Sequence, residues 1–419
     1  MASHVVVGGG VNGLSVAWRL AERGADVVVL DKGRVGGGAT GSAGGIVRNF
    51  YRAEAIAEVV RRSVEVFESE PDAYGFRQVG YLAAVPERQV DDLVAIREQH
   101  ERAGYDSELV VGAQRCREYL TWTWADWDAP VEAVLHERRG GWADAMQTVR
   151  HLAERARGAG AEIREGVEVV GFEFGDEGVT AIATSAGRIE CETVVVAPGP
   201  WIARVWSMLG LSPDVEVDGE RRPLVSYWKA QEGEFAVGGV GLSSAGPDAP
   251  VVHLDQEGPL RSDRDGRVLV PGAWGIYFRM GKTGTITGGG LPVLLSDPEL
   301  DPYGSDNPEH VAEAGFAEFF TSGLTTALRR FRGRSDDWRV TPGGGIVPHT
   351  PDNYPVCDWV LPNVYAIVDS GHGFKMLAIG RLAADDMLDD GEPLLDAFRL
   401  GRFAQGATHA ASKGPYPWT

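Results

Sequence analysis

The sequence is poor in cysteine and contains no long apolar run. Its three cysteines, Cys116, Cys191 and Cys357, are too few and too scattered for a disulfide framework or a zinc site. No stretch of about 18 or more apolar residues occurs, which argues against a membrane-spanning helix. No basic segment precedes the apolar run Val5–Val7, so no secretory signal is expected. These absences predict a cytoplasmic protein without a metal site.

Positive charge is also in short supply. The chain has 40 Lys and Arg residues against 60 Asp and Glu, a formal net charge of −20. Such a surface repels nucleic acids and anionic membranes, so neither is expected as a partner. A hydrophobic content of 43% is ordinary for a globular protein, and 419 residues suffice for about two to three domains. Monomer and homo-oligomer both remain open.

Glycine, in contrast, is abundant at 56 residues, and the start of the chain shows one use for it. Residues 4–7 form an apolar run typical of a buried strand, and residues 14–24 have the spacing of an amphipathic helix. Residues 25–31 form a second apolar run that ends in a carboxylate. This order predicts a β-α-β unit with a tight turn at residues 8–13.

The glycines of this turn fit the pattern G-x-G-x-x-G as Gly8, Gly10 and Gly13. Gly8 permits the sharp turn, Gly10 lets the backbone approach a pyrophosphate, and Gly13 lets the helix pack close to the strand. The pyrophosphate would lie at the positive N-terminus of the helix. Asp31 follows at the expected distance of about 20 residues and would bind a ribose hydroxyl. The sequence therefore predicts a Rossmann-like site for FAD or NAD.

The middle of the chain has a different pattern. Residues 217–340 contain many short strand-like runs separated by Gly, Pro and Asp, which predicts a mainly antiparallel sheet. On either side of it, helical and buried-strand patterns alternate, as in an α/β fold. Helices are expected at residues 53–67, 88–103, 143–159, 309–319 and 375–388.

Three stretches that lie far apart in the chain resemble one known family. They read GGGVNGLSVAWRLAERGADVVVLDKG at residues 8–33, GATGSAGGIVRNFY at residues 38–51 and SGHGFKMLAIG at residues 370–380. Together they resemble the D-amino-acid oxidase superfamily of flavoproteins, and within it the branch of sarcosine oxidase, N-methyl amino acid oxidase and dimethylglycine dehydrogenase. This resemblance implies FAD rather than NAD as the cofactor.

The resemblance also implies a fold and a reaction. An FAD-binding domain would comprise residues 1–75, 138–212 and 340–400, a substrate-binding domain residues 76–137 and 213–339, and a polar C-terminal tail residues 401–419. The protein would be an oxidoreductase acting on CH–NH or CH–NH2 groups. Hydride would pass to flavin N5 from the carbon next to the nitrogen of an amino acid, with a secondary or N-alkylated one favoured. The imine product would then hydrolyse.

Individual residues carry over from the family by their place in the motifs. The cofactor-binding positions lie in the first glycine turn, in the loop beside the flavin, on the adenine side and before the last helix. They are Gly8, Gly10, Val11, Asn12, Gly13, Asp31, Lys32, Ser42, Ala43, Gly45, Ile46, Val169, Gly199, Gly371, Gly373, Phe374 and Lys375.

Arg48 and Lys375 match the residues that bind the substrate carboxylate in relatives and are the expected catalytic pair. A carboxylate in a water-poor pocket needs opposite charge and several donors. Arg48 supplies a planar fork and Lys375 a point charge. The alternatives are a surface salt bridge for Arg48 and a solvent-facing helix terminus for Lys375. His372, in the same motif as Lys375, is expected to line the pocket without acting as the base.

Three aromatic residues fall where relatives line the substrate pocket. Trp274, Tyr277 and Phe278 would shape a cage for an alkylated amine or pack against an aromatic side chain. Ordinary sheet core is an equally weighted alternative for them.

The sequence departs from the family at two positions. Gly345 stands where some relatives carry a cysteine that binds FAD covalently, and the loop GSAGGIVR lacks the histidine that others use. Non-covalent FAD is therefore expected. Ile286 aligns near a lysine that lies over the flavin in oxidases and speeds the reaction with oxygen, and Lys282 stands four residues earlier. The electron acceptor therefore stays open between oxygen and another molecule.

Two other functions remain compatible with the sequence. The same flavin fold would serve to oxidise another C–N or C–O bond in a biosynthetic pathway. Alternatively, the chain would be an FAD-binding electron-relay subunit of a larger complex. The presence of both Arg48 and Lys375 favours oxidation of a small amine that carries a carboxylate.

Overall fold

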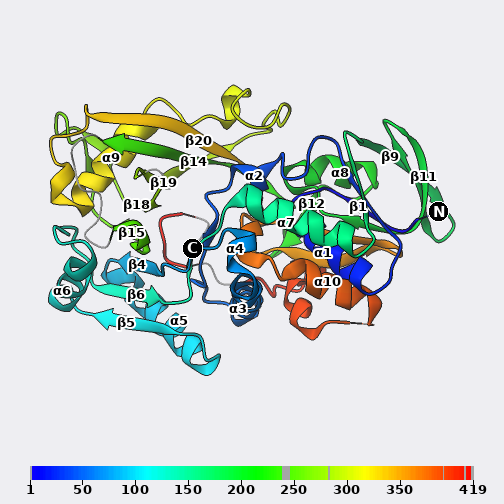
Figure 1. Ribbon diagram of the computed structural model, residues 1–419, viewed down its shortest axis with the longest axis horizontal. Helices are drawn as coiled ribbons and strands as arrows, with labels where there is room; N and C mark the ends of the chain where they lie inside the picture. The colour runs from blue at the N-terminus through cyan, green and yellow to red at the C-terminus, as the bar shows by residue number, and fades with distance from the viewer. Residues whose placement is uncertain (1, 238–245, 282–283, 390, 410–411, 417–419) are drawn as a thin grey trace.

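The apolar segments at the start of the chain form the parallel centre of a mixed sheet. In the computed structural model, which describes residues 2–237, 246–281, 284–389, 391–409 and 412–416, this sheet has eight strands and builds one of two lobes (Figure 1). β1 (Ala2–Val7) pairs in parallel with β2 (Val27–Asp31) on one side and β11 (Gly187–Val196) on the other. The outer strands are β8 (Glu162–Glu165), β22 (Val364–Val368) and β21 (Val356–Leu361), with the hairpin β9 (Val169–Gly175) and β10 (Gly178–Thr184) attached to β11.

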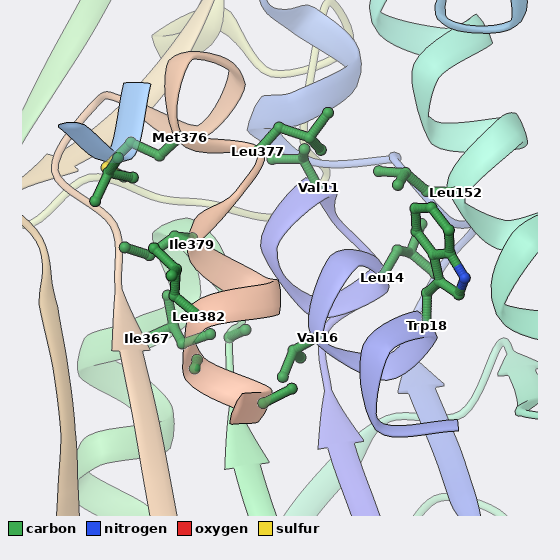
Figure 2. Packing of buried hydrophobic residues seen from close by; sticks show 14 of the residues in the cluster. Val11, Leu14, Val16, Trp18, Leu152, Ile367, Met376, Leu377, Ile379 and Leu382 are labelled. Carbon is green, nitrogen blue, oxygen red and sulfur yellow. The ribbon is translucent and has the colours of Figure 1, made fainter. Parts of the chain in front are cut away.

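Three helices from distant parts of the chain cover one side of this sheet. α1 (Val11–Glu22) packs between α7 (Ala145–Gly158) and α10 (Ile379–Leu388). Figure 2 shows Trp18 of α1 beside Leu152 of α7, and Val11 beside Leu377. Burying each such side chain contributes roughly 1.5–3 kcal/mol. The last glycine motif is thereby held against the first, although more than 300 residues separate them in the sequence.

The second lobe is a mainly antiparallel sheet in which β4 and β15 form the parallel pair. α9 (Phe316–Ala327) covers one face, where Phe320 stacks on Phe235 with ring centres 4.3 Å apart. The opposite face looks toward the first lobe. In spatial order the strands are β20 (Trp338–His349), β14 (Ser226–Val237), β19 (Ile286–Leu295), β18 (Trp274–Met280), β15 (Val251–Gln256), β4 (Tyr81–Val85), β6 (Ala133–Glu137) and β5 (Ser107–Val111).

The predicted fold class is confirmed, since a Rossmann-like unit and a mainly antiparallel sheet are both present. The helix expected at residues 309–319 is displaced, because residues 308–310 form a short 3-10 turn and α9 starts at Phe316. The expected domain boundary at residue 340 falls inside β20, which belongs to the second sheet. The other expected helices are found as α3 (Glu54–Ser69), α5 (Val90–Arg102), α7 and α10.

The described residues of the C-terminal tail make contacts with the rest of the protein, although residues 401–419 carry no core pattern in the sequence. Phe403 is buried, and the Arg402 guanidinium donates to the buried Asp352 carboxylate at 2.8 Å. The Tyr416 hydroxyl accepts a hydrogen bond from the Gly275 amide at 3.4 Å. Sequence periodicity missed these contacts because single side chains, not a regular element, make them. Within the described ranges, no helix has the length and apolar character needed to cross a membrane.

Candidate active site

A cavity of about 840 Å³ is lined by residues of both lobes. Its walls come from the turn after β1, from the loop between β2 and β3 (Ile46–Val47), from β14 and β18, and from residues 369–375 before α10. The three stretches that resemble the flavoprotein family therefore meet at one place. A cavity of this size lies within the range of small-molecule and cofactor sites, about 300–1,000 Å³.

One end of the cavity is built from backbone. Gly8 has a φ of +110°, and a Cβ added to it would lie 2.3 Å from the carbonyl oxygen of Ala197. A Cβ on Gly13 would lie 1.9 Å from the carbonyl oxygen of Gly8, so Gly13 acts through close packing and does not line the cavity. α1 begins at Val11 after Gly10, both of which line the cavity. Its positive N-terminus therefore faces a space suited to a pyrophosphate.

Asp31 ends β2 beside this turn. Its carboxylate accepts the amide of Gly9 at 2.8 Å and the amide of Gly33 at 2.8 Å. The acid thus ties the glycine turn to the following loop. It also lines the cavity, as a ribose-binding acid must.

Contacts between the lobes cover the same end. Lys32 forms an ion pair with Asp301 and lies 4.0 Å from the ring centre of Trp201. The Trp201 indole donates to Asp301 at 3.2 Å, and its ring lies 5.3 Å from that of Tyr303. Because all four residues line the cavity, the segment after β19 closes the dinucleotide end.

Two cations enter the other end from different elements. Arg48 is 4% exposed, its Nη1 donates to the carbonyl of Phe50 at 3.2 Å, and its guanidinium lies 5.3 Å from the ring centre of Tyr51. Lys375 precedes α10 and donates to the carbonyl of Gly371 at 3.3 Å. Burial, and then the charge of Arg48, lower the pKa of Lys375 to about 7. An anion bound between the two cations would relieve both effects.

Apart from Gly13, all of the predicted cofactor-binding residues line the cavity. Their binding of FAD remains a prediction. Gly45, for example, has a φ of +68°, and a Cβ there would lie 2.0 Å from the carbonyl oxygen of Ala143. The lining residues of this set are Gly8, Gly10, Val11, Asn12, Asp31, Lys32, Ser42, Ala43, Gly45, Ile46, Val169, Gly199, Gly371, Gly373, Phe374 and Lys375.

His372 lines the cavity, but both of its ring nitrogens are engaged. Nδ1 lies 2.9 Å from the Tyr51 hydroxyl, and Nε2 lies 2.6 Å from the carbonyl oxygen of Asn353. Burial, and then the charge of Lys375, hold the pKa of His372 well below its usual value. The neutral imidazole, hydrogen-bonded at both nitrogens, supports Tyr51 and the chain at Asn353, and its non-basic role stays a prediction.

β18 sends alternate side chains to opposite faces of the sheet. Tyr277 faces the cavity, as predicted. Trp274 and Phe278 are 2% and 0% exposed and pack in the core with Phe319 of α9 and with Trp124. Their assignment to the substrate pocket is therefore wrong. The period of two puts even-numbered residues of this strand on the core side and Tyr277 on the other.

The two departures from the family also have structural counterparts. Ile286 is fully buried in the core beneath the second sheet and does not line the cavity, and its alignment near a flavin-facing lysine stays a prediction. Lys282 lies outside the described residues. At Gly345, an added Cβ would lie 2.6 Å from the Tyr303 hydroxyl, which occupies the space that a cysteine side chain would need.

Sequence reasoning missed an acid in the cavity. β14 carries Glu232, which accepts a hydrogen bond from the Tyr277 hydroxyl. Burial raises the pKa of Glu232, while the Tyr277 hydrogen bond and the charges of Arg279 and Lys375 oppose the shift. Its orientation follows only from strand pairing, which no local motif reveals.

Two histidines and a tyrosine were missed for the same reason. His253 Nε2 lies 2.9 Å from Oδ1 of the buried Asp255. Burial lowers the pKa of His349 to about 4, so that this side chain is neutral at pH 7. Tyr81 lies with its ring centre 5.6 Å from the Arg48 guanidinium. All three line the cavity from strands of the second sheet.

The sequence itself matches a known family over residues 3–386, whose description is DAO, FAD dependent oxidoreductase. The chain belongs to the DAO family. Its cofactor is FAD and it is an oxidoreductase, which confirms the predicted cofactor and enzyme class. Three features at the cavity fit this cofactor. They are the tight turn that requires glycine, the N-terminus of α1 and the Asp31 carboxylate.

Curated DAO proteins share modest identity with this chain. It is 28% identical over 436 residues to sarcosine oxidase subunit beta of Rhizobium meliloti (strain 1021), a match that covers 96% of this chain and 88% of that protein. It is 27% identical over 284 residues to mitochondrial dimethylglycine dehydrogenase of Homo sapiens. That match covers 64% of this chain and 30% of the human protein, so the chain spans less than a third of the longer enzyme.

Solved structures with the same fold include two amino-acid flavoenzymes. L-proline dehydrogenase from P. horikoshii superimposes with a TM-score of 0.77 at 23% identity, covering 97% of this chain and 99% of that one. Glycine oxidase from Geobacillus kaustophilus gives a TM-score of 0.71 at 18% identity, with coverage of 96% and 97%. At these identities the likeness establishes the DAO fold.

Proposed function

We propose that the protein oxidises the C–N bond of an α-amino acid, with a secondary or N-alkylated amine favoured. FAD, when bound, accepts the hydride from the carbon next to nitrogen. The resulting imine leaves the site and hydrolyses to a carbonyl compound and an amine. Sarcosine oxidase subunit beta, the relative that matches 96% of this chain, supports a small N-alkylated amino acid as the substrate class.

One observation carries this proposal: Arg48 and Lys375 meet in the cavity that also contains the dinucleotide turn. Burial, and then the nearby charge of Arg48, lower the pKa of Lys375, so both the burial and the like charge disfavour its charged form. A carboxylate stabilises both and is fixed in orientation by the guanidinium fork. Arg48 and Lys375 would thus hold the substrate by its carboxylate and leave the adjacent carbon and nitrogen toward the flavin.

The neighbouring residues exclude water and hold this arrangement. Tyr51 and Tyr81 cover the Arg48 guanidinium, and burial raises the pKa of both, so both stay neutral. His372 bonds to Tyr51 and to the chain at Asn353. A dry wall of neutral rings strengthens the attraction between the cations and a carboxylate.

An anaerobic titration tests this function. The purified flavoprotein is mixed with a panel of α-amino acids and N-methyl amino acids. Absorbance is followed before and after air is admitted, at roughly 450 nm, where oxidised flavin absorbs. We expect one class of amino acid to bleach the flavin. The rate at which colour returns in air distinguishes an oxidase from a dehydrogenase. Absence of bleaching across the panel would contradict the proposal.

The FAD is proposed to be bound without a covalent link, because the Tyr303 hydroxyl fills the space beside Gly345. Acid precipitation should therefore release all of the flavin into the supernatant. Yellow colour that stays with the pellet would show a covalent bond. Tyr303→Phe serves as the control, since removing the hydroxyl alone creates no nucleophile and should not change the release.

A further inference from the structure

The substrate end of the cavity contains an acid as well as two cations. Glu232 enters it from β14, while Arg48 and Lys375 enter from the other lobe. Asp369, another acid at this end, accepts the amides of Ser370 at 2.8 Å and His372 at 3.1 Å. Asp369 therefore serves the backbone, which leaves the role of Glu232 to be explained.

The structure makes room for Glu232 and fixes its direction. A Cβ on Gly289 would lie 2.8 Å from the Tyr277 hydroxyl and 3.0 Å from Cγ of Glu232, so any larger residue there would displace the pair. One carboxylate oxygen accepts the Tyr277 hydrogen bond. The other lies toward Gly44, 3.2 Å from the position of a Cβ there, in the loop predicted to lie beside the flavin.

The surroundings of Glu232 favour a cationic ligand. Burial raises the pKa of the Glu232 carboxyl, which means that its charged form lacks full compensation from the protein. Arg279, on the next strand but one, donates to the carbonyls of Gly44 at 3.3 Å and Met280 at 3.1 Å. A cationic group of the ligand would supply the missing charge.

We propose that Glu232 binds the ammonium group of the incoming substrate and accepts its proton, which leaves the neutral amine that loss of hydride requires, opposite the Arg48 and Lys375 pair that binds the carboxylate. This inference rests on the proposed function and adds a selection rule to it. The two ends of the cavity wall would carry opposite charges that match a zwitterion. Amino acids are then preferred over carboxylates of the same shape that lack the nitrogen.

The test compares two ligands that differ only at the nitrogen. The first is the panel member that bleaches the wild-type flavin, and the second is its analogue with oxygen in place of NH. For sarcosine (N-methylglycine) that analogue is methoxyacetate. Affinity for the amino acid is the concentration that gives half-maximal anaerobic reduction of the flavin, and the limiting rate of reduction is measured with it. Affinity for the analogue is obtained from the change it causes in flavin absorbance without reduction.

In Glu232→Gln, we expect at least tenfold weaker binding of the amino acid and unchanged or tighter binding of the oxygen analogue. Glu234→Gln is the matched control, because Glu234 lies two residues further along β14 and is exposed. Glu234→Gln removes the same charge and should leave the affinity for both ligands unchanged. Tyr277→Phe keeps the Glu232 charge but removes its hydrogen bond, and should weaken binding of the amino acid by a smaller factor. If Glu232→Gln fails to retain FAD, this variant tests the role of Glu232 in its place.

Three results would overturn the role of Glu232. The first is an equal loss of affinity for both ligands in Glu232→Gln, and the second is no loss of affinity for either. The third is a wild-type protein that binds methoxyacetate as tightly as sarcosine. If no amino acid bleaches the wild-type flavin, the proposed function itself fails, which is a separate outcome seen before any variant is made.

Discussion

The two ends of the cavity are built by different means. The dinucleotide end consists of backbone held in place by Gly8 and Gly13, where a Cβ would collide with carbonyl oxygens. The substrate end presents side chains, with Arg48 and Lys375 from one lobe and Glu232 from the other. The glycine turn depends on one short motif and on its packing against the carbonyl oxygen of Ala197, whereas the side chains at the substrate end depend on strand register.

The largest effect is expected at the backbone end. Gly13→Ala places a Cβ 1.9 Å from the carbonyl oxygen of Gly8, which forces β1 and α1 apart. We expect loss of FAD and a free energy of unfolding lower by about 3 kcal/mol or more, measured by flavin content and denaturant titration.

Gly158→Ala is the control for that substitution. A Cβ at Gly158, in the last turn of α7, would meet no atom within 4 Å. Replacement of a helical glycine by alanine should stabilise the protein by about 0.5–1 kcal/mol and leave FAD in place. Equal stability of the two variants would show that the turn does not need Gly13.

A smaller effect is expected from pH at the substrate end. Because the pKa of Lys375 is lowered to about 7, its charge is present below that pH and lost above it. A bound carboxylate favours the charged form, so affinity for carboxylates should fall about tenfold from pH 6 to pH 8. Binding of an inert carboxylate such as methoxyacetate, followed by flavin absorbance, measures this fall.

Lys375→Met isolates the contribution of the lysine. Arg48, Glu232, Asp369, His349 and His372 also act on Lys375 electrostatically, and burial raises the pKa of both Glu232 and Asp369. Carboxylate affinity in Lys375→Met should be weaker and should lose most of its pH dependence between pH 6 and pH 8. An unchanged slope would assign the titration to another group.

The smallest effects separate the two faces of β18. Phe278→Leu lies on the core face and should lower the free energy of unfolding by about 1 kcal/mol without changing ligand affinity. Tyr277→Phe lies on the cavity face. It should raise the half-saturating amino-acid concentration and leave the free energy of unfolding nearly unchanged. Thermal unfolding and anaerobic reduction, measured on both variants, would contradict the assigned faces if the pattern were reversed.

The same contrast explains which features could be predicted from the sequence. The turn at Gly8–Gly13, Asp31, Arg48 and Lys375 lie in short local motifs, and each has the cavity or packing contact that the motif requires. Local chemistry fixes such positions because the turn, the helix start and the strand end are neighbours in the chain.

The rest depends on long-range pairing. Glu232 faces the cavity only because β14 pairs with β19 and β20, and Trp274 faces away because of the register of β18. The run of aromatic residues in β18 indicated a pocket but not which face it covered. The start of α9 was misplaced because residues 308–310 form a 3-10 turn ahead of it.

Arg48 is proposed to help bind the substrate carboxylate beside the flavin, and a titration of Arg48→Ala measures this role. Methoxyacetate is added to the oxidised flavoprotein, and the change in flavin absorbance gives its affinity. Arg48→Ala should weaken binding about 100-fold, since it removes one partner of a buried ion pair, with FAD content unchanged. Arg62→Ala, at a half-exposed position of α3 that forms an ion pair with Glu58 and does not line the cavity, should bind as the wild type does. Unchanged affinity in Arg48→Ala would remove this residue from the site and contradict the account.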